Sequence, residues 1–503
     1  MTKKTLQFGE WSGGVNHIDE TSDVARNELT EGINIELTPK GSVRLRRPIR
    51  VIDSGADFKL LGESPLLSTE LDKNIGSGVL YRKGTEIYLV FPDVAWGTVT
   101  KSLLGTLHNK IDYAFTYGGR YWLLSTDIAQ PSYVSDSIGP GAKTWSAYTT
   151  QGPTSGKLYC DTYAVYLDRL FVAVDDIVYY SVAGDFLDWS IQNGGGSFTV
   201  GTASGNRINF FHVMYNVLYI FTKYETFAYT YGTSPNVDPS LQAVSKQGSN
   251  TGLFYRDKLY CISDYGLYKF VNNIYYELKV KEEFKFYGVT NIQGFDDNLI
   301  LGSTIPTNKW FVINTDSSAV VEWEAGTSLI SSNRGTTNNF IIYTEGLLYT
   351  YLLSIIDDTM VIIPFRYQDI PEDQFYDSGS APGKLRPYTV EFVTRLEDFG
   401  TNGVYTRIYY CTSDAESYGY YDGELRIFDT QKKDGGVKLG MHVTSDTKMA
   451  YPLSRSRAVQ PRIVYKSTTA NEVTTPGQLP ISFNLTNLQL LVEAKDMQQG
   501  ERQ

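Results

Sequence analysis

Four histidines are the first residues to test for chemistry, because imidazole acts as a general base or a metal ligand near neutral pH. They are single residues far apart in the chain, namely His17, His108, His212 and His442. The sequence has no HExxH zinc motif, P-loop, GxSxG nucleophile elbow or EF-hand loop. His212 lies in the apolar stretch FFHVMYNVLYIF, which is typical of a hydrogen-bonded structural imidazole. The sequence therefore predicts no catalytic residue, no metal site, no cofactor and no enzymatic activity.

The acidic pairs and the glycine cluster are typical of turns. Asp175 with Asp176 and Asp296 with Asp297 recur beside apolar runs, and aspartate is common in turns because its side chain accepts hydrogen bonds from nearby backbone amides. The glycines at 194–196 stand before a predicted strand, whereas a phosphate-binding loop opens a helix. We interpret these residues as turns and a loop, and not as a carboxylate dyad or a phosphate site.

Three cysteines show no disulfide pattern. Cys160, Cys261 and Cys411 lie far apart and form no CxxC pair. Cys261 alternates with apolar residues in KLYCIS, and free cysteine in such a setting behaves as a small hydrophobic residue. We predict that it is buried.

Two arginine groups, in VRLRRPIR and in SRSRAVQPR, are the candidate binding residues. Their guanidinium groups could touch nucleic-acid phosphates, or could pair with acidic side chains on an adjacent subunit, and the second reading is slightly favoured. A merely solvated face is the remaining alternative for both groups. The predicted subunit or DNA contacts are Arg44, Arg46, Arg47, Arg50, Arg455, Arg457 and Arg462.

The elements that would position these residues are short strands. A turn residue followed by an apolar or aromatic strand recurs every 35 to 49 residues, a spacing typical of four-stranded propeller blades. A single aromatic hairpin such as RDKLYCISDYGLYKF is marginal alone but is covered when similar sheets stack around a ring. The sequence predicts an all-β fold with a β-propeller; a β-sandwich or an elongated array is the alternative. The repeats begin at Gly84, Gly119, Asp168, Asn216, Asp257, Asp297 and, more loosely, Glu345.

Proline and glycine divide the chain. Residues 1–60 are predicted to be an N-terminal segment that contacts the propeller or neighbouring subunits, and residues 61–363 to be the propeller. A turn-rich, proline-rich stretch then precedes residues 364–495, which are predicted to form a sandwich-like β domain that lends one strand back to the ring. Residues 496–503 are expected to be a flexible tail.

Composition limits the functions of this 503-residue chain. Its formal net charge is −11 and its pI is about 5.1, so it lacks the positive field that drives general DNA binding. Aromatic residues make up 14% of the chain, with 38 tyrosines, which favours strands. No run of about 18 apolar residues and no secretory signal is visible, so we expect no membrane span and assembly in the cytoplasm.

Two stretches resemble tail hub and nozzle proteins of short-tailed bacteriophages. The first is FGEWSGGVNHIDETSDVARNELTEGINIELTPKGSVRLRRP, and the second is IVYYSVAGDFLDWS. One departure is Ile49, which replaces the glycine that usually follows the Arg-Pro pair. The matching residues are Gly13, Gly14, Val15, Asn16, Asn34, Gly41, Arg44, Arg47 and Pro48 in the first stretch, and Tyr180, Ser181, Asp185 and Trp189 in the second.

This resemblance implies a structural protein of the virion. Proteins of this kind form a homo-oligomeric ring, commonly a hexamer, that extends the portal and adaptor channel, retains the packaged genome and conducts double-stranded DNA during ejection. The implied partners are the adaptor or portal, a tail fibre or needle, and transiently DNA. An acidic assembly would hold DNA only weakly, which suits a conduit. The alternative function is a propeller that binds or degrades glycans, and a peptide-binding adaptor is a third.

Overall fold

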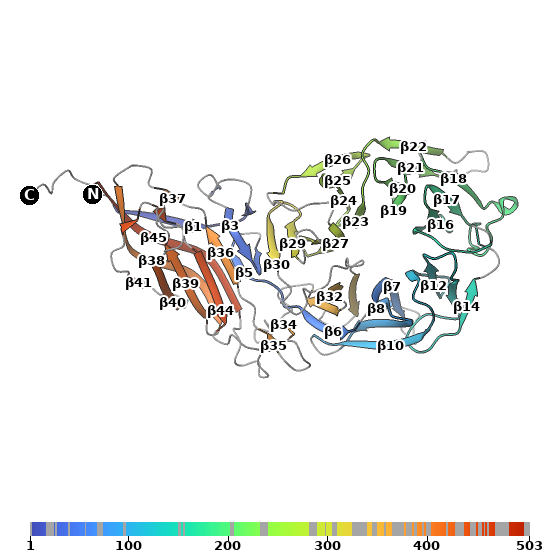
Figure 1. Ribbon diagram of the computed structural model, residues 1–503, viewed down its shortest axis with the longest axis horizontal. Helices are drawn as coiled ribbons and strands as arrows, with labels where there is room; N and C mark the ends of the chain where they lie inside the picture. The colour runs from blue at the N-terminus through green and yellow to red at the C-terminus, as the bar shows by residue number, and fades with distance from the viewer. Residues whose placement is uncertain are drawn as a thin grey trace, which may run out of the picture.

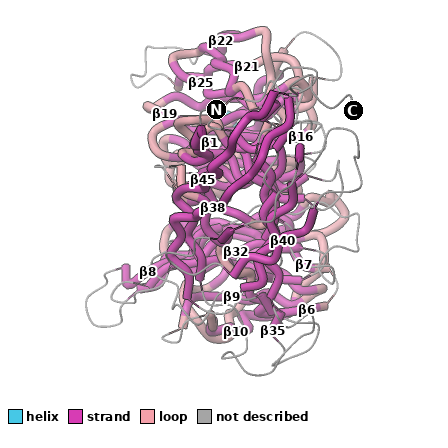
Figure 2. Tube along the Cα trace, turned by 90° about the vertical axis from the view of Figure 1, so that its left-hand side faces the viewer, coloured by secondary structure: helices cyan, strands magenta, loops and turns pink. Residues whose placement is uncertain are grey.

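The computed structural model describes most of residues 3–364 and, beyond residue 364, individual strands. Strands dominate the described residues, which contain no α-helix and a single 3-10 turn at Ile191–Asn193 (Figure 2). No helix in this part of the chain is long and apolar enough to cross a membrane. The gaps before residue 365 are 17–24, 26–27, 39–40, 56, 68–73, 94–96, 149–151, 154–155, 202–205, 232–239, 281–288, 297, 304–308, 324–339, 345–349 and 357–358.

Seven four-stranded antiparallel blades surround a ring, so the predicted propeller is confirmed (Figure 1). Blade 1 contains β7 (Phe58–Leu67), β8 (Asn74–Lys83), β9 (Glu86–Pro92) and β10 (Val99–Thr106), and blade 2 contains β11 (Ile111–Tyr117), β12 (Arg120–Ser125), β13 (Ser132–Ser135) and β14 (Trp145–Tyr148). Blade 3 contains β15 (Thr162–Tyr166), β16 (Arg169–Val174), β17 (Ile177–Tyr180) and β18 (Gly196–Thr199), and blade 4 contains β19 (Ile208–Met214), β20 (Val217–Thr222), β21 (Thr226–Thr230) and β22 (Ser240–Ser245). Blades 5 to 7 are β23 (Thr251–Tyr255), β24 (Lys258–Ser263), β25 (Gly266–Val271), β26 (Ile274–Leu278); β27 (Val289–Phe295), β28 (Asn298–Ser303), β29 (Lys309–Asn314), β30 (Val320–Trp323); and β31 (Phe340–Thr344), β32 (Thr350–Ile356), β33 (Thr359–Pro364), β6 (Arg50–Ser54).

The ring is closed by a strand from the N-terminal residues. β6 pairs antiparallel with β33, with Ser54 opposite Thr359 and Arg50 opposite Ile362. The outermost strand of blade 7 therefore precedes blade 1 in the sequence. The strand lent to the ring comes from the start of the chain, and not from the C-terminal domain as the sequence suggested.

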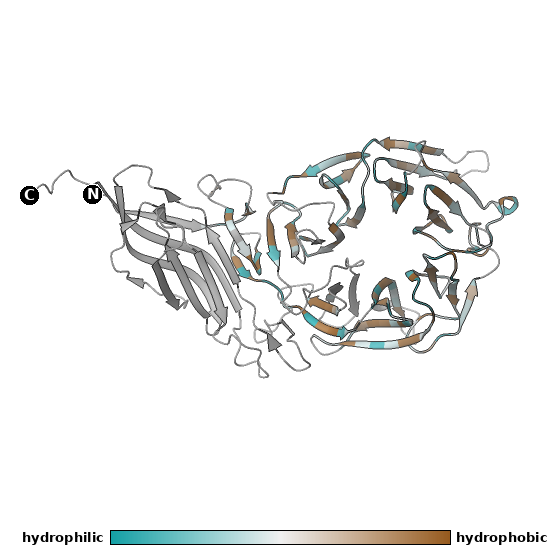
Figure 3. Ribbon diagram, viewed as in Figure 1, coloured by the Kyte–Doolittle hydropathy of each residue, from teal (hydrophilic) through white to brown (hydrophobic). Residues whose placement is uncertain are grey.

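Clusters of buried hydrophobic side chains lie between neighbouring blades. Between blades 3 and 4, for example, Phe171 and Val178 pack with Phe211, Leu218 and Phe227. Similar clusters join the other described pairs of blades, and the hydrophobic colour in Figure 3 follows the blade strands. Burial of one such side chain stabilises the fold by about 1.5 to 3 kcal/mol. Stacking between blades is therefore the main source of the ring's stability.

The repeated turn marks occupy equivalent positions in most blades. Asp168, Asn216 and Asp257 each end a two-residue turn between the first and second strands, with φ of 53°, 60° and 59°. Positive φ is what the hairpin turns of type I′ require. Gly84 instead joins the second and third strands of blade 1. The first repeat therefore starts one turn later in its blade than the others do. This explains why the spacing from Gly84 to Gly119 is shorter than the other spacings.

A sandwich-like domain of two sheets lies beside the ring (Figure 1). Its second sheet continues into blade 6 because β3 pairs with β30. The first sheet contains β1 (Lys3–Gly9), β4 (Ile35–Leu37), β5 (Val43–Leu45), β38 (Val404–Tyr418), β41 (Met449–Ala450), β42 (Arg455–Ser456) and β45 (Ser482–Asp496). The second contains β2 (Gly14–Val15), β3 (Glu28–Ile33), β36 (Val390–Thr394), β39 (Tyr421–Ile427), β40 (Val437–His442) and β44 (Arg462–Ser467); two short ribbons are β34 (Asp377–Ser378) with β35 (Leu385–Arg386) and β37 (Glu397–Asp398) with β43 (Ala458–Val459).

Candidate functional site

The first arginine group lies at the junction between the sandwich-like domain and the ring. Glu36 of β4 forms ion pairs with Arg44 and Arg47, with its carboxylate 2.9 Å from Arg44 Nη2 and 3.1 Å from Arg47 Nε. Arg47 Nη2 also contacts Asp296 Oδ2, in the turn between the first two strands of blade 6, at 2.7 Å. Arg47 and Glu36 are buried, with exposed side-chain fractions of 0% and 4%. One arginine thus ties the N-terminal residues to the propeller through two carboxylates.

Further hydrogen bonds complete this junction. Arg46 Nε donates to Asn34 Oδ1 at 2.8 Å, and the Asn34 amide donates to the Glu322 carbonyl at 2.8 Å. The indole Nε1 of Trp323 donates to the Ile35 carbonyl at 2.8 Å. Asn34 has φ of 57°, a left-handed conformation that asparagine tolerates better than most residues. Polar groups from β4 and β30 are therefore satisfied by one another and not by solvent.

The predicted surface role is wrong for Arg46, Arg47 and Arg50. Arg46 and Arg47 are fully buried and Arg50 is 7% exposed, so their guanidinium groups face the interior of their own chain. An arginine in that position cannot reach a phosphate or a neighbouring subunit. Arg44 is partly exposed and pairs with Glu36, so an external contact by it stays a prediction.

The second arginine group lies in the C-terminal strands. Arg455 begins β42, which pairs with β38 in the first sheet, and Arg462 begins β44, which lies between β36 and β39 in the second sheet. Their side chains and the whole of Arg457 lie outside the described residues. A contact with DNA or another subunit through these three arginines stays a prediction.

Other residues of the first family-like stretch also build the junction. Gly14 has φ of 79°, and a Cβ there would lie 2.6 Å from the Val320 backbone nitrogen of β30. Gly41 has φ of 78°, and its Cβ would lie 2.5 Å from the backbone of Glu10. Both positions therefore require glycine. Ile49, the departure from the family-like pattern, is fully buried.

The second family-like stretch contains β17 and part of the connection from β17 to β18 in blade 3, and this connection packs against blade 2. Asp185 Oδ1 accepts a hydrogen bond from the Leu187 amide at 2.9 Å, which shapes the loop. Phe186 stacks on Tyr117 of blade 2 with ring centroids 4.1 Å apart. Trp189 Nε1 donates to Tyr148 Oη at 3.1 Å. The aromatic residues of this stretch therefore lock two blades together.

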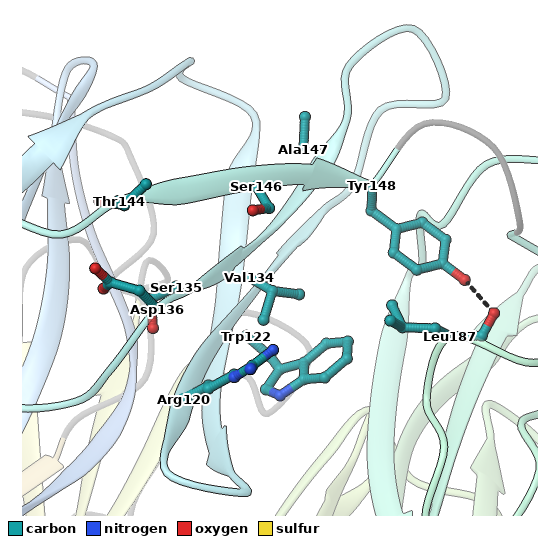
Figure 4. Close-up of a pocket in the computed structure, with 10 residues that line it drawn as sticks. All are labelled: Arg120, Trp122, Val134, Ser135, Asp136, Thr144, Ser146, Ala147, Tyr148 and Leu187. Carbon is teal, nitrogen blue, oxygen red and sulfur yellow. Dashed lines mark hydrogen bonds between the residues drawn. The ribbon is translucent and has the colours of Figure 1, made fainter.

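A pocket of about 540 Å³ opens beside that loop (Figure 4). No sequence pattern predicted this pocket, because its walls come from separate segments of two blades. Among the described residues that line it, Asp136 is the only carboxylate, so these residues do not supply the acid pair that glycosidases use. It is lined by Arg120, Trp122, Val134, Ser135, Asp136, Thr144, Ser146, Ala147, Tyr148 and Leu187.

The remaining sequence candidates have structural roles. His212 stacks on Phe254 with ring centroids 5.2 Å apart, and burial lowers its pKa to about 4. The imidazole therefore packs against an aromatic ring, as expected for a structural histidine. The hydrogen bond that the sequence predicted is missing at Nε2, which has no partner in the described part of the structure. Cys261 is buried as predicted, and burial raises the pKa of its thiol. The described residues contain no cluster of metal ligands.

The acidic pairs lie at turns, as the sequence indicated. Asp175 and Asp176 connect β16 to β17, and Asp296 connects β27 to β28. Asp297 lies outside the described residues. Asp296 also reaches Arg47, so this turn has a second role at the junction that spacing alone did not reveal.

No protein-family model matches the chain, and no curated protein matches it either. Among solved structures, the chain is similar to the WD40 propeller domain of Doa1 (7% identity, TM-score 0.40, 64% of this chain and 99% of that one). It is also similar to Chaetomium thermophilum Raptor, with 10% identity and a TM-score of 0.40 over 63% of this chain and 29% of that one. A third match is the extracellular domain of a protein from B. thetaiotaomicron, with 12% identity and a TM-score of 0.41 over 78% of this chain. The chain spans about half of the length of that domain, 47%. At these identities the likeness concerns the fold alone.

Proposed function

We propose that this chain is a structural subunit of a bacteriophage tail hub or nozzle. Six copies would form a ring below the portal and adaptor, retain the packaged genome and conduct double-stranded DNA during ejection. In this proposal the protein is assembled in the host cytoplasm, resides in the virion and performs no catalysis. Its partners are its own copies, the adaptor or portal, and a tail fibre or needle.

The observation that supports this proposal is where the family-like residues lie. Gly14, Asn34 and Arg47 all fall at the junction that fixes the sandwich-like domain to blade 6, and Gly41 packs against the N-terminal backbone at Glu10. Subunits related by a rotation form a closed ring only if the angle between their contact surfaces is constant. A rigid junction between two bodies of one subunit is therefore what a ring-forming protein needs.

The buried arginines make the proposed DNA contact weaker than the sequence suggested. With Arg46 and Arg47 used internally, the remaining surface belongs to a chain of net charge −11. Binding to a phosphate backbone depends on releasing counterions through cationic contacts. We therefore expect transient DNA contact that a moderate salt concentration abolishes.

The proposal is tested by assembly. The full chain is purified and examined by light scattering and negative-stain microscopy, alone and mixed with a candidate adaptor protein from the same genome. A ring with rotational symmetry is expected. A chain that stays monomeric at high concentration with its adaptor would rule the proposal out, whatever its ligand-binding properties.

A further inference from the structure

The pocket between blades 2 and 3 is held open by side chains that belong to its walls. Tyr148 Oη donates to the Leu187 carbonyl at 3.0 Å and accepts from Trp189 Nε1, so β14 is tied to the loop of blade 3. Ser135 Oγ accepts a hydrogen bond from the Tyr121 amide at 2.8 Å and donates to the Ser137 carbonyl at 2.8 Å. These walls need no rearrangement to receive a ligand, which lowers the entropic cost of binding.

Arg120, Asp136 and Ser146 are exposed polar side chains that line the pocket. Arg120 follows the Gly118–Gly119 turn and is exposed, and within the described residues no acidic group pairs with it. Asp136 also lines the pocket, and Ser146 lies on β14 (Figure 4). Burial raises the pKa of Asp136, but hydrogen bonds from Thr144 and Ser137 outweigh this and lower it, so the carboxylate is charged at neutral pH. The pocket thus offers a cation, an anion and a hydroxyl.

The apolar part of the pocket is small and flat. Val134 and the edge of Trp122 form its floor, and Leu187, which is 41% exposed, forms one side. This surface is too limited for a fatty chain, whose binding depends on apolar area. It suits the C–H face of a ring that carries polar groups around its edge.

The balance of charge selects the ligand. A phosphate or carboxylate would meet the Asp136 carboxylate, and an amine would meet the Arg120 guanidinium, and like charges repel each other at close range. A ring of hydroxyl groups donates to the carboxylate and accepts from the guanidinium at once. Bonds to charged partners are the stronger class of hydrogen bond.

We propose that this pocket binds a neutral pyranose unit of a polysaccharide, with Arg120 and Asp136 gripping hydroxyl groups and the Trp122–Leu187 wall packing against the sugar ring. The pocket volume of about 540 Å³ lies within the range typical of small-ligand sites and suits one or two sugar units. This site is independent of whether the chain assembles into a ring.

Saturation-transfer NMR on the purified full chain tests the proposal. The probes are the methyl glycosides of glucose, galactose, mannose and N-acetylglucosamine, together with methyl glucuronide as a charged sugar. Transfer to at least one neutral glycoside is expected. Arg120→Ala should weaken it roughly tenfold or more, as expected for loss of a charged hydrogen bond, and Asp136→Asn should weaken it as well.

Lys258→Ala is the matched control. Lys258 begins β24 directly after the turn of blade 5, the position that Arg120 holds in blade 2, so it should leave binding unchanged. Thermal unfolding of each variant checks that it is folded. The proposal fails if none of the neutral glycosides binds, if Arg120→Ala binds as well as the wild type, or if the glucuronide binds more tightly than all neutral sugars. Binding only of an extended peptide, at the open edge of β14, would also overturn it.

Discussion

Two ion-pair clusters fasten the N-terminal residues to the ring, and they differ in burial. At the junction, Arg47 pairs with Glu36 and Asp296 and is fully buried. At the closing strand β6, Asp53 pairs with Lys83 at 2.8 Å and Lys101 at 3.0 Å, and these lysines are 31% and 36% exposed. A buried pair leaves an uncompensated charge when one partner is lost, whereas an exposed pair is replaced by water. The stability of the junction should therefore depend on its ion pairs, whereas the pairing of the closing strand β6 should depend on hydrophobic packing.

The largest expected effect is at Arg47. Arg47→Ala removes a fully buried partner from the buried Glu36 carboxylate and opens a buried space beside it, and we expect the free energy of unfolding to fall by about 3 to 5 kcal/mol. Urea unfolding followed by tryptophan fluorescence measures this loss. Arg44→Ala, which removes the partly exposed partner of the same Glu36, should cost less than about 1 kcal/mol. Equal losses for the two variants would contradict the distinction drawn from burial.

A smaller loss is expected from Gly14→Ala. The added Cβ meets the backbone of β30 and the residue is held at positive φ, so we expect a cost of about 1 to 3 kcal/mol. Gly139→Ala is the control, because Gly139 also has positive φ but has no atom within 4 Å of a Cβ. If both variants lose the same stability, conformational strain explains the effect and the close approach at the junction does not.

The closing strand should tolerate loss of its ion pairs. We expect Asp53→Asn to lower the free energy of unfolding by less than about 1 kcal/mol, since its partners are about one-third exposed. The loss should shrink as salt is added, because screening weakens exposed pairs. Denaturant titrations at low and high NaCl concentration test this. A loss as large as that of Arg47→Ala would show that ring closure depends on charge.

The smallest effect is the pH dependence of the same pair. Burial raises the pKa of Asp53, but the hydrogen bonds from Lys83 and Lys101 outweigh it and hold the pKa below its ordinary value of 3.8. A carboxyl with a lowered folded-state pKa stabilises the fold above its unfolded value, and this contribution is lost as the pH falls through the folded value. The difference between wild type and Asp53→Asn should therefore persist at pH 7 and disappear below about pH 3.8. A difference that instead disappears on raising the pH would contradict the assigned sign.

The sequence predicted the ring because its evidence is local. A two-residue turn such as the one ending at Asp168 and the apolar strand after it lie within a few residues, and each blade repeats them. The hairpins within one blade resemble each other, so the sequence pattern does not distinguish the turn at Gly84, between the second and third strands, from a turn between the first and second strands. The seven blades were not predictable because the last one is completed by β6, more than 300 residues earlier in the chain.

The candidate site was harder to predict because its partners are distant. Arg47 and Asp296 are separated by 249 residues, so a run of arginines that pairs internally looks the same in sequence as one on the surface. Glu36 was the available signal, since it lies eight residues before Arg44 on the neighbouring strand of one hairpin. The pocket had no comparable signal, because Arg120 and Leu187 meet only once blades 2 and 3 have stacked.

The position of β6 also governs when the protein becomes complete on the ribosome. Its partner β33 is synthesised roughly 300 residues later, and at translation rates of about 5 to 20 residues per second this is a wait of roughly 15 to 60 s. Throughout that interval the propeller is not closed, and its unpaired strand edges can associate with other nascent chains. The order of strands in the gene therefore sets a period of vulnerability during which a chaperone would matter most.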